Sequence, residues 1–92
     1  MTFSEELLVN LLGNRSRLKI LLALWSSEEE LTVYKICKLT GLKRTVVNHH
    51  IKILVDGGFI QRKMYGEISL FTLNSSNRLG SALKEFFDKT LR

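Results

Sequence analysis

The sequence predicts a mainly α-helical fold with one small β-hairpin, and three observations lead to that prediction. Apolar residues recur at helical spacing along most of the 92-residue chain. Two of these helical stretches meet at Gly41-Leu42, which indicates a tight turn between them. Near residues 59–73, two β-rich segments flank a glycine-containing loop. The expected order is helix, helix, short strand, helix, helix, strand, strand, helix.

A helix-turn-helix is predicted in the middle of the chain. Its first helix is expected at about residues 33–40, and its second at about residues 44–55, ending at the pair Gly57-Gly58. Gly41 supplies the positive φ that a steep turn between two helices requires, because glycine has no Cβ.

Three further helices are predicted outside this motif. The first can be capped by Thr2 or Ser4 and ends at Gly13, and the second runs over about residues 15–25 with the spacing of a core helix. The last follows candidate caps at residues 74–76 and has no obvious place in a compact core. Together the elements predict a single domain over residues 1–92.

The hairpin is expected to form a wing beside the helix-turn-helix. Its strands are predicted at residues 59–63 and 68–73, joined by a loop at 64–67. A very short strand at residues 31–33 could pair with one edge of the hairpin. The predicted fold is therefore a winged helix-turn-helix.

The helices at the two ends carry broad apolar stripes, which favour a dimer interface. A plain intramolecular core is the alternative. The residues expected in that interface are Leu7, Leu8, Leu11, Leu79, Leu83, Phe86 and Phe87. The domain would then carry one dimerisation helix at each end.

The basic residues are concentrated in one part of a chain whose net charge is +5. Between positions 35 and 63, Asp56 is the one acidic residue, and the basic residues there are Lys35, Lys38, Lys43, Arg44, Lys52, Arg62 and Lys63. This concentration on the helix-turn-helix and the following strand is typical of a surface that binds a polyanion.

The second helix of the motif is expected to read DNA with its outer face. On a helical wheel, Val47, Ile51 and Leu54 lie on the side opposite to that face, and His50 flanks them as a packed, hydrogen-bonded residue. The predicted contacts to bases or phosphates from this helix are Lys43, Arg44, Thr45, Asn48, His49 and Lys52. A merely solvated face is the alternative.

Other contacts are expected from the wing and from the first helix of the motif. Arg62, Lys63 and Tyr65 suit the minor groove or the DNA backbone, with a solvated hairpin as the alternative. Lys35 and Lys38 are expected to touch phosphates. The acidic residues 28–30 are interpreted as a solvated loop.

Several classes of protein are disfavoured. No apolar run approaches the length of a membrane span and the N-terminus is acidic, so we expect no membrane partner and a cytoplasmic protein. The single cysteine, Cys37, can form neither an internal disulfide nor a thiolate zinc site alone, and we expect it to be a small core residue, with redox sensing as the alternative. The chain has no nucleotide-binding glycine loop and no acid–base pair at useful spacing, which disfavours an enzyme and any cofactor.

Four segments resemble the arsenic-repressor-like (ArsR) winged-helix regulators. They are Ile36-Cys37-Lys38-Leu39-Thr40-Gly41-Leu42, the run from Thr45 to Leu54, Arg17-Leu18-Lys19-Ile20-Leu21 and Gly58-Phe59-Ile60. The resemblance implies a homodimeric repressor whose first and last helices pair across a two-fold axis. It also implies that each recognition helix enters a major groove.

The departures from this family fall on its metal sites. Where metal-sensing members carry Glu-Leu-Cys-Val-Cys, this chain has Glu30-Leu31-Thr32-Val33-Tyr34, without either thiolate. The last helix offers Asp88 but no histidine, so a complete ligand set is not expected. Lys43 also stands where related sequences often have a serine cap. The resemblance therefore indicates a member that does not sense metals.

The leading hypothesis is a sequence-specific regulator of transcription that binds double-stranded DNA as a homodimer on a pseudo-palindromic site, and the resemblance implies a repressor. One alternative is a winged-helix interaction module in a transcription or replication assembly. Another is a nonspecific architectural DNA binder, which would bind random and operator duplexes with similar affinity.

Overall fold

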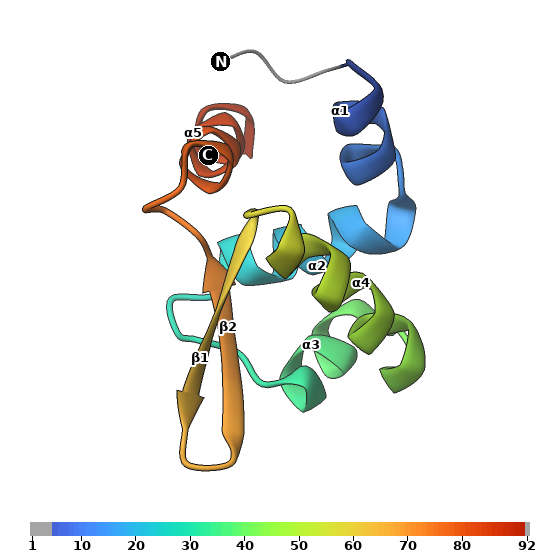
Figure 1. Ribbon diagram of the computed structural model, residues 1–92, viewed down its shortest axis with the longest axis vertical. Helices are drawn as coiled ribbons and strands as arrows, with labels where there is room; N and C mark the ends of the chain where they lie inside the picture. The colour runs from blue at the N-terminus through green and yellow to red at the C-terminus, as the bar shows by residue number, and fades with distance from the viewer. Residues whose placement is uncertain (1–4, 92) are drawn as a thin grey trace.

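The computed structural model describes residues 5–91, and its element order confirms the mainly α-helical fold with a β-hairpin (Figure 1). The elements are α1 (Glu5–Leu12), α2 (Arg15–Ser26), α3 (Val33–Thr40), α4 (Arg44–Asp56), β1 (Ile60–Tyr65), β2 (Ile68–Leu73) and α5 (Arg78–Leu91). The predicted bounds of α3 and β2 agree with the structure, and those of α2 and α4 differ by one residue.

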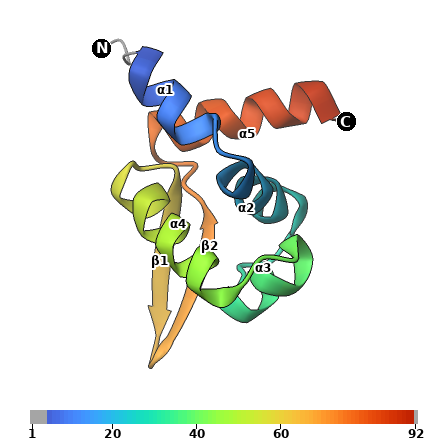
Figure 2. The same ribbon diagram turned by 90° about the vertical axis from the view of Figure 1, so that its right-hand side faces the viewer.

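The elements divide the molecule into two ends. The long axis measures 36 Å, and α1 and α5 lie at one end of it while the tip of the hairpin lies at the other (Figures 1 and 2). Helices α3 and α4 pack beside the hairpin, and α2 lies in the middle of the molecule, between its two ends. The predicted DNA-binding elements are thus remote from the predicted dimerisation helices.

The core collects residues from every helix and strand between α2 and α5. Its fully covered side chains include Ile20 and Leu21 of α2, Ile36 of α3, Val47 and Leu54 of α4, and Phe59 and Ile60 at the start of the hairpin. Each such side chain contributes about 1.5–3 kcal/mol relative to exposure. Because α4 buries one whole side in this cluster, its orientation is fixed by packing.

The helix ends follow local chemistry, with one correction to the sequence prediction. Asn14 caps α2 by accepting a hydrogen bond from Arg17 N at 3.1 Å. Gly41 takes a left-handed conformation with φ of 74°, which confirms the expected turn. For α5, however, the side chain that accepts a hydrogen bond from Leu79 N is that of Asn77, not one of residues 74–76.

The predicted short strand at residues 31–33 is reduced to a single antiparallel bridge between Leu31 and Phe71. It cannot extend, because Thr32 accepts a hydrogen bond from Lys35 N as the cap of α3 and Val33 already belongs to that helix. The hairpin is longer than predicted, since Tyr65 pairs with Ile68 across a turn of only two residues.

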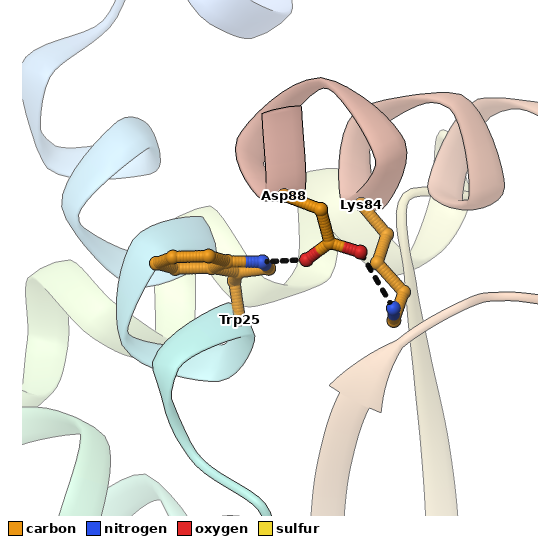
Figure 3. Close-up of polar contacts among 3 residues, drawn as sticks. All are labelled: Trp25, Lys84 and Asp88. Atoms are coloured by element: carbon orange, nitrogen blue, oxygen red, sulfur yellow. Dashed lines mark hydrogen bonds and ion pairs between the residues drawn. The ribbon is translucent and has the colours of Figure 1, made fainter. Parts of the chain in front are cut away.

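Helix α5 does have a place in the core, which corrects the expectation from sequence. Trp25 of α2 donates from Nε1 to Asp88 Oδ1 at 2.7 Å, and Lys84 Nζ lies 3.0 Å from Asp88 Oδ2 (Figure 3). The ring of Phe87 packs edge-on against Trp25 at 5.8 Å between centroids. Leu83 and Phe87 are only 7% and 4% exposed within one chain. They are core residues of the monomer and are not available to a second copy.

Candidate nucleic-acid interface

Helix α4 separates a buried face from an exposed polar face. Val47, Ile51 and Leu54 are buried, as the helical wheel predicted. The residues of the predicted reading set are all exposed, as is Asp56 at the C-terminal end of the helix; the set is Lys43, Arg44, Thr45, Asn48, His49 and Lys52. Within residues 5–91 none of these six makes a side-chain hydrogen bond or ion pair that would occupy its polar group. The outer face of α4 therefore offers unoccupied donors and charges.

The N-terminal end of α4 adds positive potential to that face. The first helical hydrogen bond runs from Val47 N to Lys43 O, so the preceding amides lack helical partners. Lys43 occupies the cap position without a side-chain cap bond, which agrees with the absence of a serine there. The ammonium and guanidinium groups of Lys43 and Arg44 thus lie at the positive end of the helix dipole, where an anion would be stabilised.

His50 lies on the other side of the helix and is a structural residue, as predicted. It is 8% exposed, and its Nδ1 accepts a hydrogen bond from Arg17 Nε at 3.1 Å. Burial lowers the pKa of His50 below its ordinary value, and the charges of Arg17 and His49 lower it further. Because Arg17 can only donate, this bond requires the neutral imidazole. His50 therefore fixes α4 against α2.

A groove of about 710 Å³ lies between α4 and the hairpin. Three cations line it, with Arg44 and Lys52 on the helix and Arg62 on β1. Asn48 and Ser69 add polar groups, and the remaining lining residues are Thr32, Val33, Tyr34, Ile51, Val55, Asp56, Glu67, Ile68 and Phe71. The three cations outnumber the two carboxylates of the lining, Asp56 and Glu67, and lie on both walls, which makes the groove suitable for a phosphodiester backbone.

The predicted wing residues do not share one face of the hairpin. Successive residues of a strand point to opposite faces, so Arg62 faces the groove while Lys63 and Tyr65 face away from it. Arg62 Nε donates to Ser69 Oγ at 3.1 Å. Lys63 Nζ lies 3.1 Å from Glu30 Oε2, and the Tyr65 hydroxyl donates to Glu30 Oε1 at 3.4 Å. The view of residues 28–30 as a wholly solvated loop is therefore wrong for Glu30.

Helix α3 contributes two exposed lysines and an aromatic residue that sequence reasoning missed. Lys35 and Lys38 are exposed, as the predicted phosphate contacts must be. Tyr34 is exposed, lines the groove and lies under Lys38 Nζ, 5.3 Å from the ring centroid. The sequence could have indicated Tyr34, because it is a large aromatic residue on the outer side of a short amphipathic helix.

The predicted dimer residues fall into three groups. Phe86 is 60% exposed and Leu79 is partly buried, whereas Leu83 and Phe87 lie in the core. The side chains of Leu7, Leu8 and Leu11 lie outside those that the structure describes. Val9 of α1 and Leu91 of α5, which were not predicted, are 67% and 55% exposed. Among the described side chains, apolar residues remain exposed on both end helices, but Leu83 and Phe87 of the predicted set are not among them.

The described residues contain neither a metal-ligand cluster nor a membrane-spanning helix. No group of three or more potential ligands among them could hold a metal ion, and Asp88 is engaged by Trp25 and Lys84. Cys37 is partly buried and packs against the core. Over the same residues, no helix combines the length and apolar character that a membrane crossing needs.

The element order, the wing and the two-faced helix α4 define a winged helix-turn-helix domain. A family model described as a helix-turn-helix domain matches residues 12–62, and the chain belongs to this family. A comparison with curated protein sequences gives no match.

Solved structures with this fold come from proteins of several kinds. HlyU from Vibrio cholerae is 20% identical over 95% of this chain and 91% of its own, with a TM-score of 0.74. TubR from Bacillus thuringiensis serovar israelensis, solved bound to 24 bp of tubC, is 17% identical over 97% of both chains, with a TM-score of 0.75. A homodimeric winged helix-turn-helix DNA-binding domain from Mycobacterium bovis, Mb0332, described as a possible ArsR-family transcriptional regulator, is 25% identical over 89% of this chain and 76% of its own, with a TM-score of 0.67.

Proposed function

We propose that this chain is a sequence-specific regulator of transcription that binds double-stranded DNA. The observation that carries the proposal is the exposed polar face of α4 beside a groove whose two walls bear Arg44, Lys52 and Arg62. The family match and the likeness to a DNA-bound protein support it. Residues 1–92 would act as one DNA-binding domain in the cytoplasm.

The exposed face divides into base-reading and phosphate-binding groups. The major groove is about 12 Å wide and admits a helix such as α4. Asn48, His49 and Thr45 carry short polar side chains that can reach base edges, while Lys43 and Arg44 at the helix start suit phosphates. Lys52 can serve either purpose.

One DNA strand would pass through the groove between α4 and the hairpin. Arg44 and Lys52 would contact its phosphates from the helix side, and Arg62 from the wing side. Lys35 and Lys38 would extend the contact along α3. Base contacts from α4 and phosphate contacts from both walls would together fix the position of the domain on the duplex.

The regulator would act as a homodimer of the ArsR-like type, and as a repressor. The exposed apolar residues Val9, Phe86 and Leu91 lie on helices at the end remote from the wing, so a partner there leaves both reading faces free (Figures 1 and 2). The homodimeric Mb0332 domain supports this arrangement. Two-fold symmetry would demand a pseudo-palindromic site with half-sites about one helical turn, or a multiple of it, apart.

The experiment that tests the proposal selects bound duplexes from a random pool and compares the selected site with random DNA over a range of salt. We expect the selected site to bind tighter by a factor of roughly 10³ or more. Similar affinities for both would instead identify an architectural binder. No salt-dependent DNA binding at all would contradict the proposal and favour a protein-interaction module.

The dimer is tested separately by sedimentation. We expect the wild-type chain to sediment as a dimer and Phe86→Glu to sediment as a folded monomer, because Phe86 is exposed on α5. A wild-type chain that is monomeric at high concentration would contradict the dimer while leaving DNA binding by one domain open to test.

A further inference from the structure

The contact between Glu30 and the wing joins two parts of the chain that lie far apart in the sequence. The Glu30 carboxylate lies against two wing residues, with Oε2 at 3.1 Å from Lys63 Nζ and Oε1 accepting from the Tyr65 hydroxyl at 3.4 Å. Lys63 and Tyr65 stand on the same face of β1, two residues apart. One carboxylate therefore engages both polar side chains of that face near the wing tip.

The backbone fixes Glu30 in this position. The next residue, Leu31, is buried and exchanges two backbone hydrogen bonds with Phe71 of β2, at 3.0 and 2.8 Å. The side chain of Glu30 consequently starts at the edge of the hairpin and reaches across β2 to β1. Glu28 and Glu29, in the same loop, are exposed and make no ion pair with the described residues. Of the three glutamates in this loop, Glu30 is therefore the one that forms an ion pair with the wing.

The pairing also acts on the pKa of the lysine. The close approach and the charge of Glu30 raise the pKa of Lys63 above its ordinary value. The Glu30 side chain is 26% exposed and the atom Oε2 itself is covered from solvent. Oε2 accepts no hydrogen bond from the described residues, so the ion pair with Lys63 is its polar contact.

We propose that Glu30 sets the DNA affinity of the wing by holding Lys63 on the protein's own carboxylate, so that a DNA phosphate must compete with Glu30 for this cation. This inference rests on the proposed DNA-binding function and concerns the regulation of that same site. If a phosphate took Lys63, Glu30 would lose the cation that lies 3.1 Å from its Oε2. In the wild-type chain Lys63 therefore contributes less to DNA binding than an unpaired cation would.

The two basic residues of β1 differ for this reason. Arg62 faces the groove and donates to a neutral hydroxyl, Ser69 Oγ, so its charge is not neutralised by a carboxylate. Lys63 faces the other way and is paired with an acid. Glu30 would thus keep the wing to one effective cation, which limits the sequence-independent part of the affinity.

The test uses Glu30→Gln in the full chain, with Glu28→Gln as the matched control. The amide in the first variant retains a carbonyl oxygen for the Tyr65 hydroxyl and removes only the charge, while the control makes the same change in charge two residues away. We expect Glu30→Gln to steepen the dependence of log K on log salt by about 0.9 per bound chain and to tighten binding at about 0.1 M salt by roughly five- to tenfold. Glu28→Gln should leave the slope unchanged.

Two further variants separate release of the cation from a general effect of charge. In a Lys63→Met background, Glu30→Gln should no longer change the salt slope, because no cation is released. Tyr65→Phe should leave the slope as in the wild type, since the ion pair persists. Independently of DNA, an NMR titration of the Lys63 side chain should give a lower pKa in Glu30→Gln than in the wild type.

The outcomes separate this inference from the proposed function. If the wild-type chain shows salt-dependent DNA binding but Glu30→Gln and Glu28→Gln have the same slope, the role of Glu30 is refuted and the DNA-binding function stands. Weaker DNA binding by Glu30→Gln would also refute it, because Glu30 would then support the wing instead of withholding Lys63. If the wild-type chain binds no DNA, the proposed function itself fails and the inference fails with it.

Discussion

Helix α4 and the wing both expose cations, but they treat charge in opposite ways. On α4 the polar outer face is unoccupied, and the titratable residue on the inner face, His50, is held neutral because burial lowers its pKa. On the wing, Lys63 is paired with the carboxylate of Glu30, which raises the pKa of the lysine. Among the described residues, the cations on the outer face of α4 have no acidic partner, whereas on the wing Lys63 is paired with an acid of the same chain.

The difference follows from how each element is supported. One side of α4 is buried against the core, so its position does not depend on its outer side chains. Of the six residues of β1, only Ile60 is buried. The outer half of the hairpin has little apolar contact, and polar side-chain contacts such as that of Glu30 remain to hold its residues. Outer side chains are free to contact DNA only where the element is held in place by its other side. The buried side of α4 does this, and β1 has no comparable buried side.

The largest expected effect tests this difference in support. Leu54→Ala should lower the free energy of unfolding by about 2–5 kcal/mol, because Leu54 is fully buried under α4. Ile68→Ala, the matched change on the wing, should cost less than about 0.5 kcal/mol, because Ile68 is exposed. Urea unfolding of both variants measures the two values. Equal losses would show that the wing is as firmly packed as the helix.

The second prediction concerns what the unoccupied face of α4 does. Asn48→Ala should weaken binding to the selected site by about 1–3 kcal/mol and leave binding to random DNA nearly unchanged, because a base contact is lost. Gln61→Ala removes another exposed amide, on β1 and outside the groove, and serves as the control. Fluorescence anisotropy with both duplexes measures the effect. Equal losses on the two duplexes would assign Asn48 to the DNA backbone.

Local sequence was sufficient for the elements and for the two faces of α4. The bounds of α3, the positive φ of Gly41 and the burial of His50 follow from residues within a few helical turns. The same holds for the exposed set from Lys43 to Lys52. These features depend on spacing along the chain, which the sequence displays directly.

The sequence could not predict contacts between distant segments. An apolar stripe on α5 does not reveal whether it faces the same chain or a second copy, and the answer for Leu83 and Phe87 lies in the packing against α2. The contact from Trp25 to Asp88 spans 63 positions, and that from Glu30 to Tyr65 spans 35. The alternation of side chains along a strand could have placed Lys63 and Arg62 on opposite faces of the hairpin. It could not have shown which acidic residue would pair with Lys63.

The third prediction compares the two walls of the groove. Arg44→Ala and Arg62→Ala should each reduce the salt slope by about 0.9 per bound chain, because each removes one cation facing the groove. Lys89→Ala, which removes a cation from α5 at the far end of the molecule, should leave the slope unchanged. Salt titrations on random DNA measure all three. A normal slope for Arg62→Ala alone would restrict DNA contact to α4.

The smallest expected effect concerns the inner side of α4. Since burial depresses the pKa of His50 in the folded chain, its contribution to stability is complete above the unfolded value of 6.5 and is lost as pH falls toward the lower folded value. His50→Asn retains an acceptor for Arg17 and removes this titration, whereas His49 is present in both chains. The wild-type chain should therefore be the more stable at about pH 7.5, and the gap should narrow between about pH 6.5 and 5. Urea unfolding of both chains across this range measures the gap. A gap that stays constant would mean that His50 is not held neutral by the fold, and the contrast with Lys63 would be lost.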